Sequence, residues 1–213
     1  MPFRSLDPTA FKNGDRISAK ALRSLKPNSS SEQLVRPKSQ HKQKSTNYLA
    51  SLAEWRDLFS KAISDYLKNS GLRTKKDLEY YEQVKFFYHV SCHYPNLRYR
   101  IHASPNGGSR KGSAEGHRFN ASGLSKGWPD VEVLMMRGGY GALFIEFKSQ
   151  IVDYKNEQTA LKEVKEHQHK HRLALLSEGY MAVVCYGAEE GVLVIDAYMA
   201  GQPMPEFILN RWG

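Results

Sequence analysis

Two apolar runs joined by a pair of glycines constrain the fold of this chain more than any other feature. The first run spans 131–136 and the second spans 142–147, with Arg137-Gly138-Gly139 between them. Adjacent glycines adopt positive φ angles without strain, which suits the tight turn of a β-hairpin. The sequence therefore predicts two antiparallel strands that fold back on each other around Gly138.

Two carboxylates flank this hairpin symmetrically. Asp130 lies eight residues before Gly138, and Glu146 lies eight residues after it. If the strands pair symmetrically, the two side chains lie opposite each other with Cβ atoms roughly 4.5–5.5 Å apart. Like charges repel at that distance unless a cation lies between them, and Mg²⁺ prefers such oxygen ligands.

A lysine follows Glu146 two residues later, so Lys148 lies on the same face of the predicted strand. Its ammonium can offset charge that develops on a phosphate, and the backbone carbonyl of Phe147 can act as a further metal ligand. Ile145 and Phe147 point into the core. The pattern predicts a metal site for phosphodiester hydrolysis. The alternative is a solvated hairpin, because Glu-x-Lys is common on strands and a register shift of one residue would separate the acids.

The rest of the pattern predicts an α/β fold with a small mixed sheet flanked by helices. Apolar spacing predicts helices at about 46–71, with a cap near Ser45 or Thr46, and at about 77–93 and 157–178. Short apolar runs predict strands at 99–102, 181–186 and 192–195. In the second helix, Glu79 shares a face with Phe86 and Val90, whereas Glu82 lies about 60° from that face.

The charge of the chain indicates an acidic partner. The net charge is +9, and residues 1–45 hold ten Lys and Arg against three Asp and Glu. We expect this segment to be a flexible basic tail that neutralises phosphates. A purely solubilising extension is the alternative, and an anionic membrane is a weaker one because the tail has no apolar helical face.

Glycine and basic residues before the hairpin are candidate contacts to nucleic acid. Asn-Gly-Gly turns expose backbone N–H groups that can approach a phosphate closely. The candidates are Asn106, Gly107, Gly108, Arg110, Arg118 and Lys126.

The cysteines, apolar runs and histidines of the sequence argue against a disulfide framework, a membrane span and a zinc site. Cys92 and Cys185 are too few for a disulfide framework, and no apolar run is long enough to cross a bilayer. We expect a cytoplasmic location, in a bacterium or a phage-infected host cell. His167 and His171 lie one helical turn apart, but no cysteine or acidic cluster completes a zinc site. Glu132 is a candidate fourth carboxylate or a solvated neighbour.

The motifs together resemble a known family. Gly127-Trp128-Pro129-Asp130 followed by Glu146-Phe147-Lys148 resembles the PD-(D/E)XK nuclease signature, and more specifically the short phage and bacterial members of the VRR-NUC family. Glu79-Tyr80-Tyr81-Glu82-Gln83 matches an E-x-x-x-Q helix element of that family. The loop 105–110 matches its P-N-G-G-x-R element, and Gln168 precedes Gly179-Tyr180 as in its last motif. The resemblance covers about residues 75–200.

The resemblance implies a restriction-endonuclease-like core and a catalytic set. Glu79, Asp130 and Glu146, with the Phe147 carbonyl, would hold Mg²⁺ or Mn²⁺. Lys148 would be the catalytic lysine, and Gln168 would orient the lysine, water or metal shell. Two departures leave alternatives open: Gln158 is a rival for Gln168 because the spacing after Lys148 is long, and Glu82 is a rival for Glu79.

The expected protein is a DNA endonuclease. The family suggests selectivity for branched or Holliday-junction DNA and a homodimer, with no membrane partner. A non-selective trimming nuclease and a non-catalytic DNA-binding protein on a nuclease fold are the alternatives. The expected organisation is a basic tail (1–45), an accessory helix (46–74), the nuclease domain (75–200) and a C-terminal extension (201–213).

Overall fold

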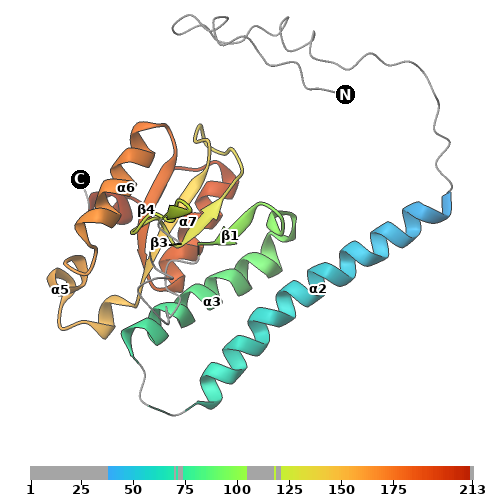
Figure 1. The fold of residues 1–213 in the computed structure, drawn as a ribbon, viewed down its shortest axis with the longest axis horizontal. Helices are drawn as coiled ribbons and strands as arrows, with labels where there is room; N and C mark the ends of the chain where they lie inside the picture. Colours follow the sequence, from blue (N-terminus) through green and yellow to red (C-terminus); the bar gives the residue numbers. More distant parts are fainter. Residues whose placement is uncertain (1–37, 70, 72–73, 105–117, 119–120, 212–213) are drawn as a thin grey trace, which may run out of the picture. The chain divides into compact units, whose positions relative to one another are not determined.

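The structure is a computed structural model that describes residues 38–69, 71, 74–104, 118 and 121–211 (Figure 1). The chain divides into two compact units, residues 1–42 and 43–213. Most of the predicted basic tail lies outside the described residues. So do four candidate nucleic-acid contacts, namely Asn106, Gly107, Gly108 and Arg110.

The element order alternates helices with a small set of strands. The helices are α2 (Lys38–Lys68), α3 (Lys75–His93), α5 (Glu157–Leu161), α6 (Glu166–Ser177), α7 (Ala188–Ala200) and α8 (Glu206–Asn210). The strands are β1 (Ile101–Ala103), β2 (Val131–Val133), β3 (Leu143–Lys148) and β4 (Met181–Tyr186), with short 3-10 turns η2 (Pro95–Leu97) and η3 (Ile151–Asp153). No described helix is both long enough and apolar enough to cross a membrane.

The strands form one mixed sheet in the order β1-β2-β3-β4. The pairs β1–β2 and β2–β3 are antiparallel, and β3–β4 is parallel. A parallel pair needs a long crossover connection, which η3, α5 and α6 provide here. The prediction of an α/β fold with a small mixed sheet is confirmed.

The hairpin folds about the predicted glycines. Val131 pairs with Ile145, which is the register that is symmetric about Gly138. Gly138 and Gly139 have φ angles of 57° and 88°, and the backbones of Arg137 and Tyr140 exchange hydrogen bonds of 3.1 and 2.8 Å. Positive φ at both central residues gives the turn a twist that matches the strands.

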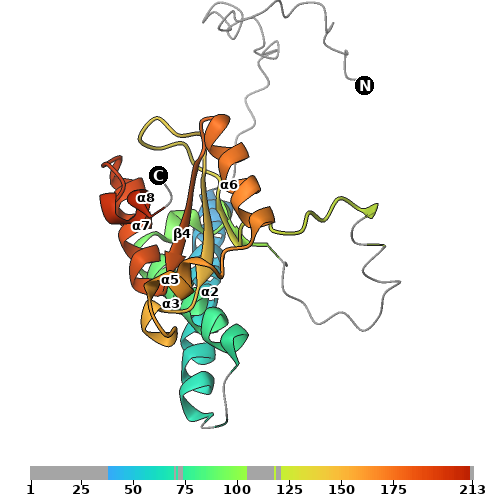
Figure 2. The same ribbon diagram turned by 90° about the vertical axis from the view of Figure 1, so that its left-hand side faces the viewer.

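Helices cover both faces of the sheet. Figure 2 shows α7 and α6 on opposite sides of it. On the α3 and α7 side, Phe86 and Phe147 lie 5.1 Å apart between ring centroids. A Cβ at Gly191 would lie 2.7 Å from the Phe147 ring, so glycine allows α7 to approach β3 closely. On the α6 side, Phe144 packs with Leu175 and Ala182.

The long helix α2 packs on α3. Trp55 is buried, Phe59 stacks on Phe87 at 5.4 Å, and Tyr66 stacks on Tyr81 at 3.8 Å. Trp55, Phe59 and Tyr66 recur at helical spacing, in agreement with the helix that the apolar spacing predicts here. The helix begins at Lys38, earlier than the predicted cap at Ser45 or Thr46. Its first residues include Lys and Gln, which are good helix formers.

Two of the predicted elements are wrong. The predicted strand at 192–195 is part of α7, because Gly187 breaks the chain after β4 and the buried residues Gly191, Val194 and Ile195 recur at helical spacing. The predicted helix at 157–178 is two helices, α5 and α6. Lys165 separates them in an extended conformation, and the Gln168 side chain accepts a 2.9 Å hydrogen bond from its backbone.

Strand β2 is also shorter than the predicted run to residue 136. The Met135 amide bonds back to the Val133 carbonyl at 3.0 Å, and Leu134 and Met136 are exposed. The chain therefore leaves the sheet before the turn.

Candidate active site

The candidate catalytic residues lie at the carboxyl end of β3, where its partner β2 begins. Glu146 and Lys148 alternate with Phe147, so both point to the face opposite Phe147. Asp130 directly precedes β2, and its Oδ2 accepts a 2.8 Å hydrogen bond from the Phe147 amide. That bond holds Asp130 beside Glu146, as the symmetric register of the hairpin requires.

Glu146 and Lys148 form a buried ion pair. Each residue is 5% exposed, and Lys148 Nζ lies 2.5 Å from Glu146 Oε1. Gln168 Nε2, from α6, donates to the same oxygen. The other oxygen, Glu146 Oε2, is buried and accepts no hydrogen bond from the described residues. An unpartnered buried carboxylate oxygen is costly, and it is an atom that a cation can bind.

Burial and mutual repulsion set the charges of the acids. Burial first, and Asp130 second, raise the pKa of Glu146 to about 8 against the opposing effect of Lys148. Burial also raises the pKa of Asp130, although the Phe147 amide opposes that effect. A positive charge between the two acids would relieve both effects.

Lys148 stays charged in this setting. Burial lowers its pKa, but Glu146, Glu79 and Asp130 outweigh burial, so the pKa lies above its usual value. The buried ammonium is therefore available as a cation and as a hydrogen-bond donor.

The two candidate glutamates of α3, Glu79 and Glu82, have different interactions in the structure. Glu79 interacts electrostatically with Lys148 and Asp130, and burial raises its pKa. The Glu82 carboxylate is used elsewhere: it accepts hydrogen bonds of 2.6 Å from the Ala188 amide and 3.0 Å from Gln150 Nε2. Glu82 thereby caps the start of α7. Of the two glutamates, Glu82 is thus engaged at the start of α7, and Glu79 is the one that interacts electrostatically with Lys148 and Asp130.

The two candidate glutamines, Gln168 and Gln158, also differ in their interactions. Gln168 contacts Glu146, whereas Gln158 is exposed on α5. The Gln168 Oε1 atom is engaged by the Lys165 amide, which leaves its Nε2 for Glu146. Gly127, at φ 86°, lies against α6 here, since a Cβ at this position would be 3.0 Å from the Gln168 nitrogen.

Glu132 has its own partners. Its Oε1 accepts hydrogen bonds from Ser104 Oγ and Trp128 Nε1, and His102 lies 3.8 Å away. Trp128 also packs edge-on against Phe144 at 5.7 Å. Glu132 and Trp128 therefore brace the segment that positions Asp130, and Glu132 is not a free fourth carboxylate.

The remaining candidates lie around the site or outside the described residues. Arg118 and Lys126 are exposed. His171 bonds to Ser125 Oγ at 2.9 Å. Cys185 is fully buried in the core.

Sequence reasoning did not identify two hydroxyls beside the cluster. Ser149 Oγ and Tyr154 Oη are both buried. Burial raises the pKa of Tyr154, and the Ser149 side chain opposes that effect. Glu79 and Lys148 also act electrostatically on Tyr154. The only sequence signal was the position of Ser149 next to Lys148, which predicts nothing alone.

The donor set fits a divalent cation that takes few protein ligands. No three His, Cys, Asp or Glu side chains among the described residues already form a metal-ligand group. Mg²⁺ commonly binds one or two carboxylates and completes its shell with waters and substrate phosphate. Asp130 and the unpartnered Glu146 Oε2 suit that demand, and Glu79 interacts electrostatically with Asp130.

A mixed sheet that carries two carboxylates and a lysine on its central hairpin has the design of a PD-(D/E)XK nuclease core. No protein-family profile and no curated protein matches the chain. A solved structure described as a VRR_NUC domain protein is 30% identical over 49% of this chain and 71% of its own. The two structures superpose with a TM-score of 0.38. The chain is thus similar to a VRR_NUC domain protein, in agreement with a VRR-NUC-like fold.

Proposed function

We propose that this chain is a Mg²⁺-dependent or Mn²⁺-dependent DNA endonuclease that hydrolyses phosphodiester bonds. One observation carries the proposal. The buried Glu146 carboxylate has one oxygen bound by Lys148 and Gln168, and the described residues leave the other without a partner beside Asp130. Similarity to a solved VRR_NUC domain protein supports nuclease activity in general.

Each residue has a role in this proposal. Asp130 and Glu146, with Glu79 and the Phe147 carbonyl, would hold the cation. A bound Mg²⁺ supplies Lewis-acid stabilisation of phosphate charge and activates water. Gln168 fixes the Glu146 carboxylate through its Nε2, so that the second oxygen keeps one orientation.

Lys148 acts on the phosphate. Water loses a proton and attacks phosphorus in line, the bond to the leaving oxygen breaks, and that oxygen takes up a proton, so that no proton is gained or lost overall. Negative charge builds up on the non-bridging oxygens during the attack. The Lys148 ammonium, which remains protonated because the acids raise its pKa, donates a hydrogen bond to that charge.

A cleavage assay tests this proposal. The wild type should cut DNA in Mg²⁺ or Mn²⁺ and leave it intact in EDTA. Asp130→Ala should lose cleavage and keep metal-independent DNA binding. Lys61→Ala, on the exposed surface of α2, is the matched control and should cut like the wild type. Equal cleavage by Asp130→Ala and the wild type would refute the site.

Substrate selectivity extends the proposal. We propose a preference for branched DNA, such as four-way junctions, cut by a homodimer, because two active sites related by a two-fold axis suit a two-fold symmetric junction. Four-way, flap, single-stranded and plain duplex DNA should be cut side by side. Equal rates on plain duplex would favour a non-selective trimming nuclease, and binding without any cleavage would favour a non-catalytic DNA-binding protein.

A further inference from the structure

The segment before β2 packs closely against α6, the helix that carries Gln168. Ser125 Oγ and His171 Nε2 lie 2.9 Å apart. Gly127 has a φ of 86°, and a Cβ at this position would clash with the His167 ring. Glycine at this position therefore allows the backbone beside Lys126 to lie against α6.

Positive groups gather around His167. Burial first and Lys126 second lower the pKa of His167, and Lys148 acts in the same direction. Glu166 opposes them, but its carboxylate is already paired with Lys170 at 2.7 Å. Positive charge therefore dominates between Lys126 and the lysine of the candidate active site.

Lys126 and His167 are both accessible to a ligand. Lys126 is exposed and forms no ion pair with another described residue, and His167 is partly exposed. Like charges that are held close together repel, and an anion between them relieves the repulsion. The close approach at Gly127 maintains this arrangement, which a merely solvated surface would not need.

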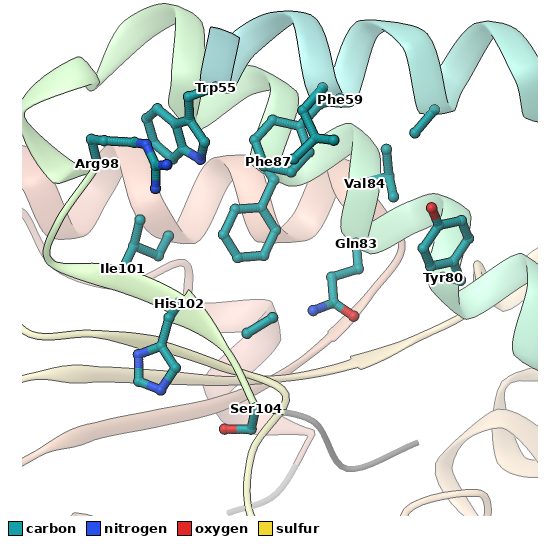
Figure 3. A pocket seen from close by; sticks show the side chains of 13 residues that line it. Trp55, Phe59, Tyr80, Gln83, Val84, Phe87, Arg98, Ile101, His102 and Ser104 are labelled. Carbon is teal, nitrogen blue, oxygen red and sulfur yellow. The ribbon is translucent and has the colours of Figure 1, made fainter. Parts of the chain in front are cut away.

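The cavity of about 530 Å³ between α2, α3 and β1 has a different character. Figure 3 shows mainly aromatic and aliphatic side chains around it, among them Phe87 and Ile101. Its Arg98 guanidinium lies over the Trp55 ring at 5.3 Å. The positive surface of Lys126 and His167 is therefore the better site for an anion.

We propose that Lys126 and His167 bind a phosphate of the DNA strand next to the phosphate that faces Lys148. The inference rests on the proposed nuclease function and adds a second phosphate contact to the same site. A DNA phosphate supplies the negative charge that Lys126 lacks, and its non-bridging oxygens accept hydrogen bonds from an ammonium and from an imidazole N–H.

The salt dependence of DNA binding in EDTA tests this inference without any cleavage. A protein cation that neutralises one phosphate releases counterions, and its loss lowers the slope of the logarithm of the binding constant against the logarithm of the salt concentration by about 1. Lys126→Ala should therefore lower the slope by about 1. Lys126→Arg keeps the charge and should restore the slope.

His167→Ala should give a different result at about pH 8, where an ordinary histidine is neutral. A neutral imidazole donates a hydrogen bond but releases no counterion. We expect binding to weaken by about tenfold at every salt concentration, as for the loss of a hydrogen bond to a charged group, with the slope unchanged. Fluorescence anisotropy with a labelled duplex measures both variants.

Lys61→Ala is the matched control, because it removes the same charge from the exposed surface of α2. It should keep the slope and the affinity of the wild type. Circular dichroism confirms that each variant is folded.

Several results would overturn the inference: no DNA binding by the wild type in EDTA, an unchanged slope for Lys126→Ala, an equal loss of slope for Lys61→Ala, or wild-type affinity for His167→Ala. Cleavage in Mg²⁺ reports separately on the nuclease proposal. A wild type that shows the expected slopes but cuts no DNA would refute the nuclease and leave the phosphate contact in place.

Discussion

Strand β3 buries both of its faces, but the two faces are built from different chemistry. On one face, Ile145 and Phe147 pack against α3 and α7 and are almost fully buried. On the other, Glu146 and Lys148 are equally inaccessible, yet one Glu146 oxygen lacks a partner among the described residues. The side chains of the first face are fully packed in the apolar core. The second face has polar atoms whose burial a purely structural role does not explain.

The difference teaches where stability and function are located in this domain. Apolar burial on the α3 and α7 side stabilises the fold. A buried ion pair contributes little net stability, because desolvation of the charges opposes their attraction. Substitutions on the apolar face of β3 should therefore lower the stability of the fold, and substitutions on the polar face should lower cleavage.

The largest expected effect is on catalysis. Lys148→Ala removes the ammonium that we propose faces the phosphate, and we expect cleavage to fall by about 10³-fold, in the range found when one charge-stabilising donor is lost. Single-turnover cleavage in Mg²⁺ measures it. Cleavage within tenfold of the wild type would show that this face of β3 is not catalytic.

The next effect is on stability. Ile145→Ala leaves a cavity on the apolar face, and we expect the free energy of unfolding to fall by about 3 kcal/mol. Urea denaturation measures the loss. Cleavage per folded molecule should be unchanged at low temperature, since Ile145 points away from the acids. A catalytic defect without destabilisation would contradict the division between the faces.

A similar contrast separates the glutamates of α3. Glu82→Ala removes the cap of α7 and leaves the Ala188 amide unpaired, which should cost about 2 kcal/mol of stability. Glu79→Ala should leave stability nearly unchanged and impair cleavage. Thermal unfolding and cleavage rates of both variants, measured together, decide the assignment. If Glu82→Ala lost cleavage without losing stability, the two roles would have to be exchanged.

The smallest expected effect is a gain in the stability of the fold. Replacement of the ion pair by Glu146→Leu with Lys148→Met removes two buried charges, and we expect the free energy of unfolding to rise by about 1 kcal/mol. The single variant Glu146→Ala is the control, and it should be destabilised because Lys148 then lacks its partner. A strongly destabilised double variant would mean that the Glu146–Lys148 ion pair is needed to stabilise the fold.

Much of the site could be predicted from the sequence because the hairpin is local. Positive φ at Gly138 and Gly139 fixes the turn, and the turn fixes the register that brings Asp130 to Glu146. Lys148 then follows from the alternation of a strand. These steps need only the spacing of neighbouring residues.

Other features could not be predicted, because they depend on packing between distant segments. The choice between Glu79 and Glu82 depends on α7, which follows them by a hundred residues and takes the Glu82 carboxylate. The run at 192–195 is too short to distinguish a strand from a buried helix. The break between α5 and α6, and the placement of Gln168, depend on contacts with Gly127 and Glu146.

Calorimetric titration with Mn²⁺ tests most directly the claim that the polar face of β3 holds a cation. The wild type should show saturable binding, and the Glu146→Leu, Lys148→Met double variant should bind at least about tenfold more weakly, as for the loss of metal-site groups. Equal binding by the two folded proteins would contradict the claim.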